Sequence, residues 1–121
     1  MKKLFLTGLA SGSLLLLTAC GTQQPTTLYY WGNNNADVYQ RLKSDGKPLG
    51  EQINNMEKYF QEAAKKQQSP APGAHAHLGL LLNDAGQTRQ AQSEFEAEKA
   101  QFPESSAFMD FLLKKYKGAN K

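Results

Sequence analysis

The chain has 121 residues, 40% of them hydrophobic and 21% charged, a composition that excludes wholesale disorder and fibrous repeats and allows a single domain. Its net charge of +3 falls to about +1 (12 basic and 11 acidic residues) without Lys2 and Lys3, which lie in a segment expected to be cleaved, so a nucleic-acid-binding surface is not supported. The single cysteine excludes a disulfide within the chain and a cysteine-rich metal site.

The N-terminal segment has the features of an export signal. Lys2 and Lys3 precede a mostly apolar stretch over residues 4–17, which is too short to span a bilayer at about 20 residues. The sequence Leu-Thr-Ala-Cys-Gly at residues 17–21 then resembles the lipobox of bacterial lipoproteins. An ordinary signal peptide with an incidental cysteine, or a short buried helix, is the alternative interpretation.

The lipobox resemblance implies a membrane anchor. Residues 1–19 would be a cleaved lipoprotein signal peptide, and Cys20 would carry an S-diacylglycerol group and an N-acyl chain such as palmitate. Two or three acyl chains hold a protein on a bilayer stably, whereas one chain holds it only marginally. Gly21 after the cysteine implies sorting to the periplasmic face of the outer membrane. Residues 20–27 form a polar tether, whose seven residues after Cys20 reach at most roughly 23 Å.

Residues 28–121 are predicted to form an all-α domain of about five helices. Helices are expected over residues 36–43, 50–67, 74–84 and 88–101, and from Ser105 or Ser106 onward. Apolar residues in these segments recur at steps of three and four, whereas no segment alternates in the manner of a strand, so no sheet is expected. The first helix would place Val38, Tyr39 and Leu42 on one side, and the last would carry Phe108 and Phe111 within a broad apolar face.

Residues 75–103 show a specific spacing. The residues that carry it are His75, Leu78, Gly79, Leu82, Gly86, Ala91, Phe95 and Pro103. This spacing resembles a tetratricopeptide (TPR) repeat, in which small residues let two antiparallel helices approach and large ones fill the seam. His75, Leu82 and Glu98 depart from the family pattern, and a generic helical hairpin is the alternative. The first two helices could form a degenerate preceding unit, and the fifth would cap the last apolar face.

A second resemblance spans nearly the whole mature chain. Its motifs are Tyr-Tyr-Trp-Gly at residues 29–32, Pro-Gly-x-His-Ala-His-Leu-Gly at 72–79 and Glu-Lys-x-x-Phe-Pro-Glu-Ser at 98–105. These motifs are similar to those of an uncharacterised family of small proteobacterial lipoproteins. Members tend to be encoded beside a lipoprotein similar to the curli secretion channel, which implies a partnership with other envelope lipoproteins or a secretion-channel-like protein.

The sequence offers no recognisable catalytic or metal site. His75 and His77 are two positions apart and so point to different sides of a helix. Glu94, Glu96 and Glu98 form an acidic strip, which is expected to be solvated or to face a partner. We therefore expect neither an enzyme nor a small-molecule substrate, and no cofactor besides the covalent lipid.

Two sets of residues are predicted to bind a protein partner. Tyr29, Tyr30 and Trp31 either pack on the first two helices or form an exposed anchor, and His77, Leu80 and Leu81 would face a groove of the helical array. The basic C-terminus, with Lys114, Lys115, Lys117 and Lys121, either complements the helix dipole or contacts anionic lipid. The predicted function is a lipid-anchored adaptor or assembly factor; the alternative is a structural envelope lipoprotein without a dedicated groove.

Overall fold

A computed structural model describes residues 27–43 and 46–118. The predicted signal peptide, Cys20 and most of the tether therefore lie outside the described residues, as does Lys121. The elements are β1 (Tyr29–Tyr30), α1 (Asn34–Leu42), α2 (Leu49–Lys65), β2 (Ser69–Pro70), α3 (Ala74–Asp84), α4 (Thr88–Gln101), the 3-10 turn η1 (Pro103–Ser105) and α5 (Ser106–Gly118). The prediction of a predominantly helical chain with five helices is confirmed for this part.

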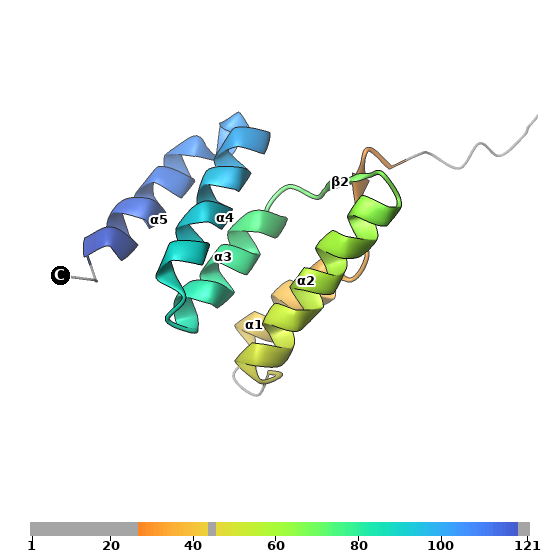
Figure 1. The fold of residues 1–121 in the computed structure, drawn as a ribbon, viewed down its shortest axis with the longest axis horizontal. Helices are drawn as coiled ribbons and strands as arrows, with labels where there is room; N and C mark the ends of the chain where they lie inside the picture. Colours follow the sequence, from red (N-terminus) through yellow and green to blue (C-terminus); the bar gives the residue numbers. More distant parts are fainter. Residues whose placement is uncertain (1–26, 44–45, 119–121) are drawn as a thin grey trace, which may run out of the picture.

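The helices stand side by side in chain order. α2, α3, α4 and α5 follow one another along the longest axis of the molecule, and α1 lies against α2 and α3 (Figure 1). Each helix packs on the next, and the α3–α4 hairpin forms the most extensive contact between any two elements. None of the described helices is both long enough and apolar enough to cross a membrane.

The α3–α4 hairpin shows why its small residues matter. A Cβ atom at Gly79 would lie 2.5 Å from the Phe95 ring and 3.2 Å from the Ala91 carbonyl oxygen, so the helices approach as closely as glycine permits. Gly86, with a φ of +78°, lies in the turn that ends α3, where the Gln87 amide donates a hydrogen bond to the Leu82 carbonyl oxygen. Ala91 and Phe95 are fully buried, as the spacing predicts.

The core runs through α2 to α5 and leaves α1 at its edge. Met56, Leu81, Phe95 and Met109 are its most deeply buried large apolar side chains. α1 contributes no buried apolar side chain. Tyr39 and Leu42 are exposed and only Val38 is half-buried, so the apolar side predicted for this helix is not a core face.

A two-stranded sheet corrects the prediction that the chain has none. β1 pairs in parallel with β2, with Tyr29 opposite Ser69 and Tyr30 opposite Pro70. Strands of two residues are too short to produce alternation in the sequence, and their pairing joins segments that lie far apart along the chain. The pair holds the start of the domain against the loop between α2 and α3.

The outer face of α5 also differs from the prediction. Met109, Leu112 and Leu113 enter the core, but Phe108 and Phe111 are 56% and 57% exposed. The helix therefore covers α4 with one side while its other side leaves two aromatic rings in solvent. The predicted broad apolar face is divided between these two sides.

Candidate functional site

The predicted partner-binding segment Tyr29–Trp31 is mostly packed on the domain. The Tyr29 ring meets Phe102 edge-on at 5.6 Å, and the Tyr30 ring lies 5.2 Å from that of Tyr59. The Tyr59 hydroxyl donates a hydrogen bond to the Tyr30 carbonyl oxygen and accepts one from the Ala71 amide. Of the three residues, Trp31 alone is exposed, at 42% of its surface.

The three predicted groove residues of α3 lie differently from the expectation. Leu80 is half-buried, whereas His77 and Leu81 are buried, which corrects their placement on an open groove. α3 lies in the middle of the array, and α1 lies alongside it, with Arg41 of α1 paired to Asp84 of α3 at 3.0 Å. Helical periodicity shows which residues share a face of α3, but it does not show that α1 lies over one of them.

His77 is a buried imidazole without a hydrogen-bond partner among the described residues. Burial and, to a smaller extent, the positive charge of Arg41 lower the pKa of His77 from 6.5 to about 4. The ring is therefore neutral at physiological pH. It belongs to the interior of the domain.

A groove of about 460 Å³ lies between α2 and α4, and residues of α3 also line it. Its walls combine apolar, acidic and amide side chains, namely Glu57, Phe60, Gln61, His75, Leu78, Leu82, Gln90 and Glu94. We call these eight residues the α2–α4 groove. No Lys or Arg lines it, so its charged groups are of one sign apart from the imidazole.

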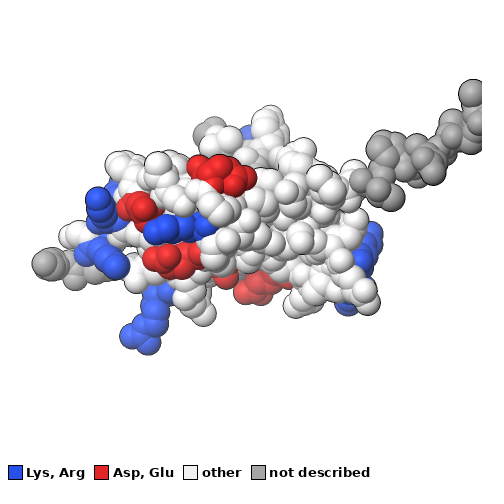
Figure 2. All heavy atoms as spheres, turned by 90° about the horizontal axis from the view of Figure 1, so that it is seen from above, with Lys and Arg blue, Asp and Glu red and all other residues white. Residues whose placement is uncertain are grey.

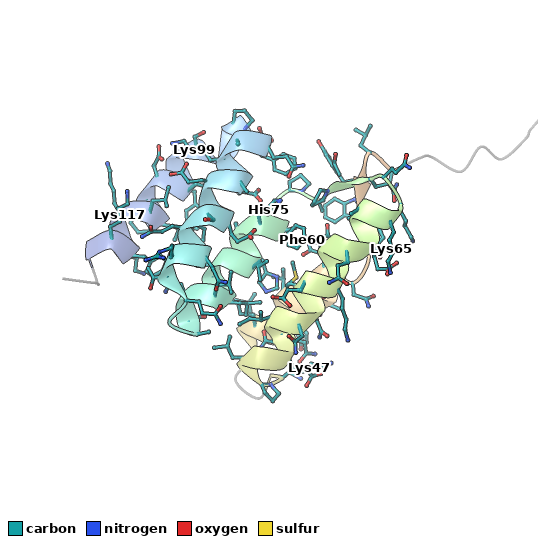
Figure 3. All side chains as sticks on the ribbon, viewed as in Figure 1. Lys47, Phe60, Lys65, His75, Lys99 and Lys117 are labelled. Carbon is teal, nitrogen blue, oxygen red and sulfur yellow. The ribbon has the colours of Figure 1, made fainter. Side chains whose placement is uncertain are left out.

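Three side chains from three helices meet in this groove. His75 Nδ1 lies 2.6 Å from Glu94 Oε2 and donates a hydrogen bond to the carboxylate. The Phe60 ring covers the imidazole, with ring centroids 4.5 Å apart and an interplanar angle of 32°. Figure 3 shows Phe60 on α2 facing His75 on α3. The imidazole is thereby held between a carboxylate and an aromatic face.

The lining side chains determine what the groove can offer a ligand. No hydroxyl or thiol lines the groove, so the His–Glu pair has no side-chain nucleophile beside it there. No group of three or more potential metal ligands occurs in residues 27–43 and 46–118. An apolar floor with carboxylates at the edge can instead accommodate the aliphatic stem and the cationic head of a Lys or Arg side chain.

Glu98 positions this site, and its role was not predicted. Its carboxylate is buried and accepts hydrogen bonds from the Gly73 amide at 2.7 Å and the Ala76 amide at 3.4 Å. Gly73 precedes α3 and has no side chain with which to cap this helix. The Glu98 carboxylate of α4 accepts from the amides at the start of α3 instead, and its charge complements the dipole of α3. Of the predicted acidic strip, Glu98 is thus internal, Glu94 lines the groove and Glu96 is exposed.

The His75–Glu94 contact was also not predicted, although the sequence contains a signal for it. In an antiparallel hairpin, residues equally far from the turn lie opposite one another. The close approach of Gly79 to Ala91 sets this register around Gly86, and it places residue 75 opposite the region of residue 94. The contact of Phe60 with His75 has no such signal.

A second hollow of about 500 Å³ lies between α1 and α2. It is lined by Tyr30, Asn33, Ala36, Asp37, Gln40, Lys47, Asn55, Lys58, Tyr59 and Glu62. Burial raises the pKa of the Asp37 carboxyl against opposing effects of Lys47 and Asn55. Its lining carries charges of both signs, two carboxylates and two lysines.

Comparison with known proteins gives a family without an assigned activity. The family described as "Domain of unknown function (DUF4810)" matches residues 28–112, which include every element from β1 to most of α5. Neither the curated proteins nor the solved structures contain a significant match. Since the match covers most of the sequence, the chain belongs to the DUF4810 family.

Proposed function

We propose that the protein is a lipoprotein adaptor anchored at the periplasmic face of the outer membrane, which binds another envelope protein through the α2–α4 groove. The lipobox-like sequence around Cys20 supports the anchor. The TPR-like spacing of the α3–α4 hairpin supports a role in protein binding. A lipid anchor confines such an adaptor to a surface and raises its effective concentration near membrane-bound partners.

The observation that carries the proposal is the composition of the α2–α4 groove. Phe60, Leu78 and Leu82 supply apolar surface, and Glu57 and Glu94 supply negative charge without a neighbouring Lys or Arg in the lining. His75 is fixed by Glu94 and Phe60, so the groove is largely formed before a ligand enters. The ligand that fits is a partner segment with a basic side chain flanked by apolar residues.

A crosslinked pull-down from the native envelope tests both parts. We expect one or two envelope proteins to be recovered with the wild-type chain and lost with Cys20→Ala, which cannot be acylated. Phe60→Ala and Glu94→Gln should reduce the recovery, because they remove the aromatic wall and the negative charge. Glu96→Gln is the matched control, since Glu96 is exposed on the same helix outside the groove.

Each result has a distinct meaning. Equal recovery with Glu94→Gln and Glu96→Gln would place the interaction elsewhere on the molecule. No specific recovery with a stably folded, acylated chain would support the alternative of a structural lipoprotein. Recovery that is unaffected by Cys20→Ala would contradict the anchored adaptor.

A further inference from the structure

The exposed side of α5 combines aromatic and basic residues. The Phe108 and Phe111 rings stack on each other, with centroids 6.4 Å apart and an interplanar angle of 15°. In residues 27–43 and 46–118, no other element covers them, and both are more than half exposed. Two large apolar groups next to each other in water indicate a contact surface.

Positive charge follows directly along the helix. Lys114, Lys115 and Lys117 are exposed, and Lys115 lies over the ring of its neighbour Tyr116 at 5.6 Å. Neither Lys114 nor Lys117 forms an ion pair within the part of the chain that the structure describes. Basic side chains project from the end of the molecule that α5 occupies (Figure 2), where Figure 3 labels Lys117.

The acidic groups of α5 do not offset this charge. Asp110 is paired with Lys99 of α4 at 2.7 Å, and Glu104 lies in η1, before the first turn of the helix. The surface formed by Phe108, Phe111, Lys114 and Lys115, here the α5 surface, is therefore apolar and cationic. Its chemical complement is apolar and anionic.

A second copy of the chain fits this surface poorly. Two Phe rings that are a little more than half exposed offer on the order of 200 Å². A stable protein interface buries about 1,200–2,000 Å² in total. Lysines beside the rings would also repel those of another copy, whereas a bilayer surface needs only a few inserted rings and supplies negative charge.

We propose that the α5 surface docks on an anionic lipid bilayer, with Phe108 and Phe111 in the headgroup region and Lys114 and Lys115 on lipid phosphates. Aromatic rings favour this boundary, and lysine stems can extend along it while their charges stay hydrated. β1, where the described chain begins, lies toward the opposite end of the longest axis from α5 (Figure 1). If the proposed anchor at Cys20 holds that end, docking of α5 lays the molecule along the membrane.

A single-tryptophan reporter tests the docking in the full-length acylated protein. Trp31 is the only tryptophan, so Trp31→Phe with Phe108→Trp places one fluorophore on the α5 surface. The matched reporter is Trp31→Phe with Tyr39→Trp, because Tyr39 is equally exposed but lies on α1. Both are reconstituted into vesicles with brominated acyl chains, made either of phosphatidylcholine alone or with added phosphatidylglycerol.

Docking predicts quenching that depends on position and charge. Because docked rings lie about 5–10 Å into the headgroup–acyl boundary, bromine should quench the reporter at 108 roughly twofold more than the reporter at 39 in anionic vesicles. The difference should vanish in phosphatidylcholine alone and when Lys114 and Lys115 are changed to Gln. Melting by circular dichroism checks that every variant is folded.

Three results would overturn the proposal. The first is equal bromine quenching at positions 108 and 39. The second is a change in the fluorescence at position 108 that rises with protein density and not with anionic lipid. The third is a change in that fluorescence that requires an added envelope protein. The last two would assign the surface to a second copy or to a protein partner. Mass spectrometry shows whether Cys20 is acylated, independently of the docking of α5. If it is not acylated, the same reporter still measures docking on added anionic vesicles.

Discussion

At the scale of single residues, Glu98 links the two helices of the central hairpin. The carboxylate satisfies two amides at the first turn of α3, in the interior of the domain. A tetratricopeptide pattern expects a small apolar residue here, so the departure in the sequence is explained by a charge that caps a neighbouring helix. A buried charge of this kind stabilises a fold only while its partners are in place.

Glu98→Ala should lower the free energy of unfolding by about 2–3 kcal/mol, because the buried Ala76 amide and the partly buried Gly73 amide lose their acceptor. Glu96→Ala, on the exposed side of the same helix, should change it by less than about 0.5 kcal/mol. Urea denaturation followed by circular dichroism measures both. An equally small loss of unfolding free energy in both variants would show that water can replace the Glu98 carboxylate as the hydrogen-bond acceptor.

His77 makes the stability of the fold depend on pH. Its pKa is lowered from 6.5 to about 4 in the folded protein, so the unfolded chain binds more protons between these values. Stability that is fully present above pH 6.5 should therefore be lost progressively as the pH falls toward 4. The loss from this group is on the order of 1–3 kcal/mol.

The measurement is the free energy of unfolding at pH 7 and at pH 5 for the wild type and for His77→Leu. The substitution removes the titrating ring but keeps an apolar side chain of similar size, so the loss on acidification should shrink. An unchanged pH dependence in His77→Leu would mean that the imidazole is hydrated in the folded state. Carboxylates shared by the two proteins cancel in the comparison.

At the scale of elements, the α3–α4 hairpin is the part that the sequence predicts best. The small residues Gly79 and Ala91, the large Phe95 and the turn at Gly86 each have a local steric reason, and each occupies its expected role. The β1–β2 pair and the burial of His77 could not be predicted in this way, because both depend on segments that meet only after folding. The candidate site combines a contact within the hairpin, His75–Glu94, with a contact between distant segments, Phe60–His75.

Gly79→Ala should destabilise the protein by about 1–3 kcal/mol, because its methyl group would overlap the Phe95 ring. Gly50→Ala is the matched control, since nothing lies within 4 Å of a Cβ there and alanine favours helix by up to about 1 kcal/mol. Thermal unfolding should thus shift in opposite directions for the two substitutions. A shift in the same direction would contradict the close approach of α3 and α4.

At the scale of the whole molecule, the order of helices determines where a partner can bind. α3 is surrounded by α1, α2 and α4, so its predicted contact residues His77 and Leu81 became core. The part of this helix that remains accessible lines the α2–α4 groove, where Phe60 of α2 and Glu94 of α4 contact His75. Sequence periodicity predicts the faces of each helix, whereas the neighbours of each face follow from the packing of the array.

The most direct test of the adaptor proposal is site-specific photocrosslinking in the native envelope. A photoreactive amino acid replaces Gln90, which lines the α2–α4 groove, or Gln101, which is also exposed on α4 but lies outside it. The proposal predicts an adduct with one envelope protein from position 90 that is absent from position 101 and is lost with Cys20→Ala. Adducts from position 101 alone, or identical adducts from both positions, would contradict it.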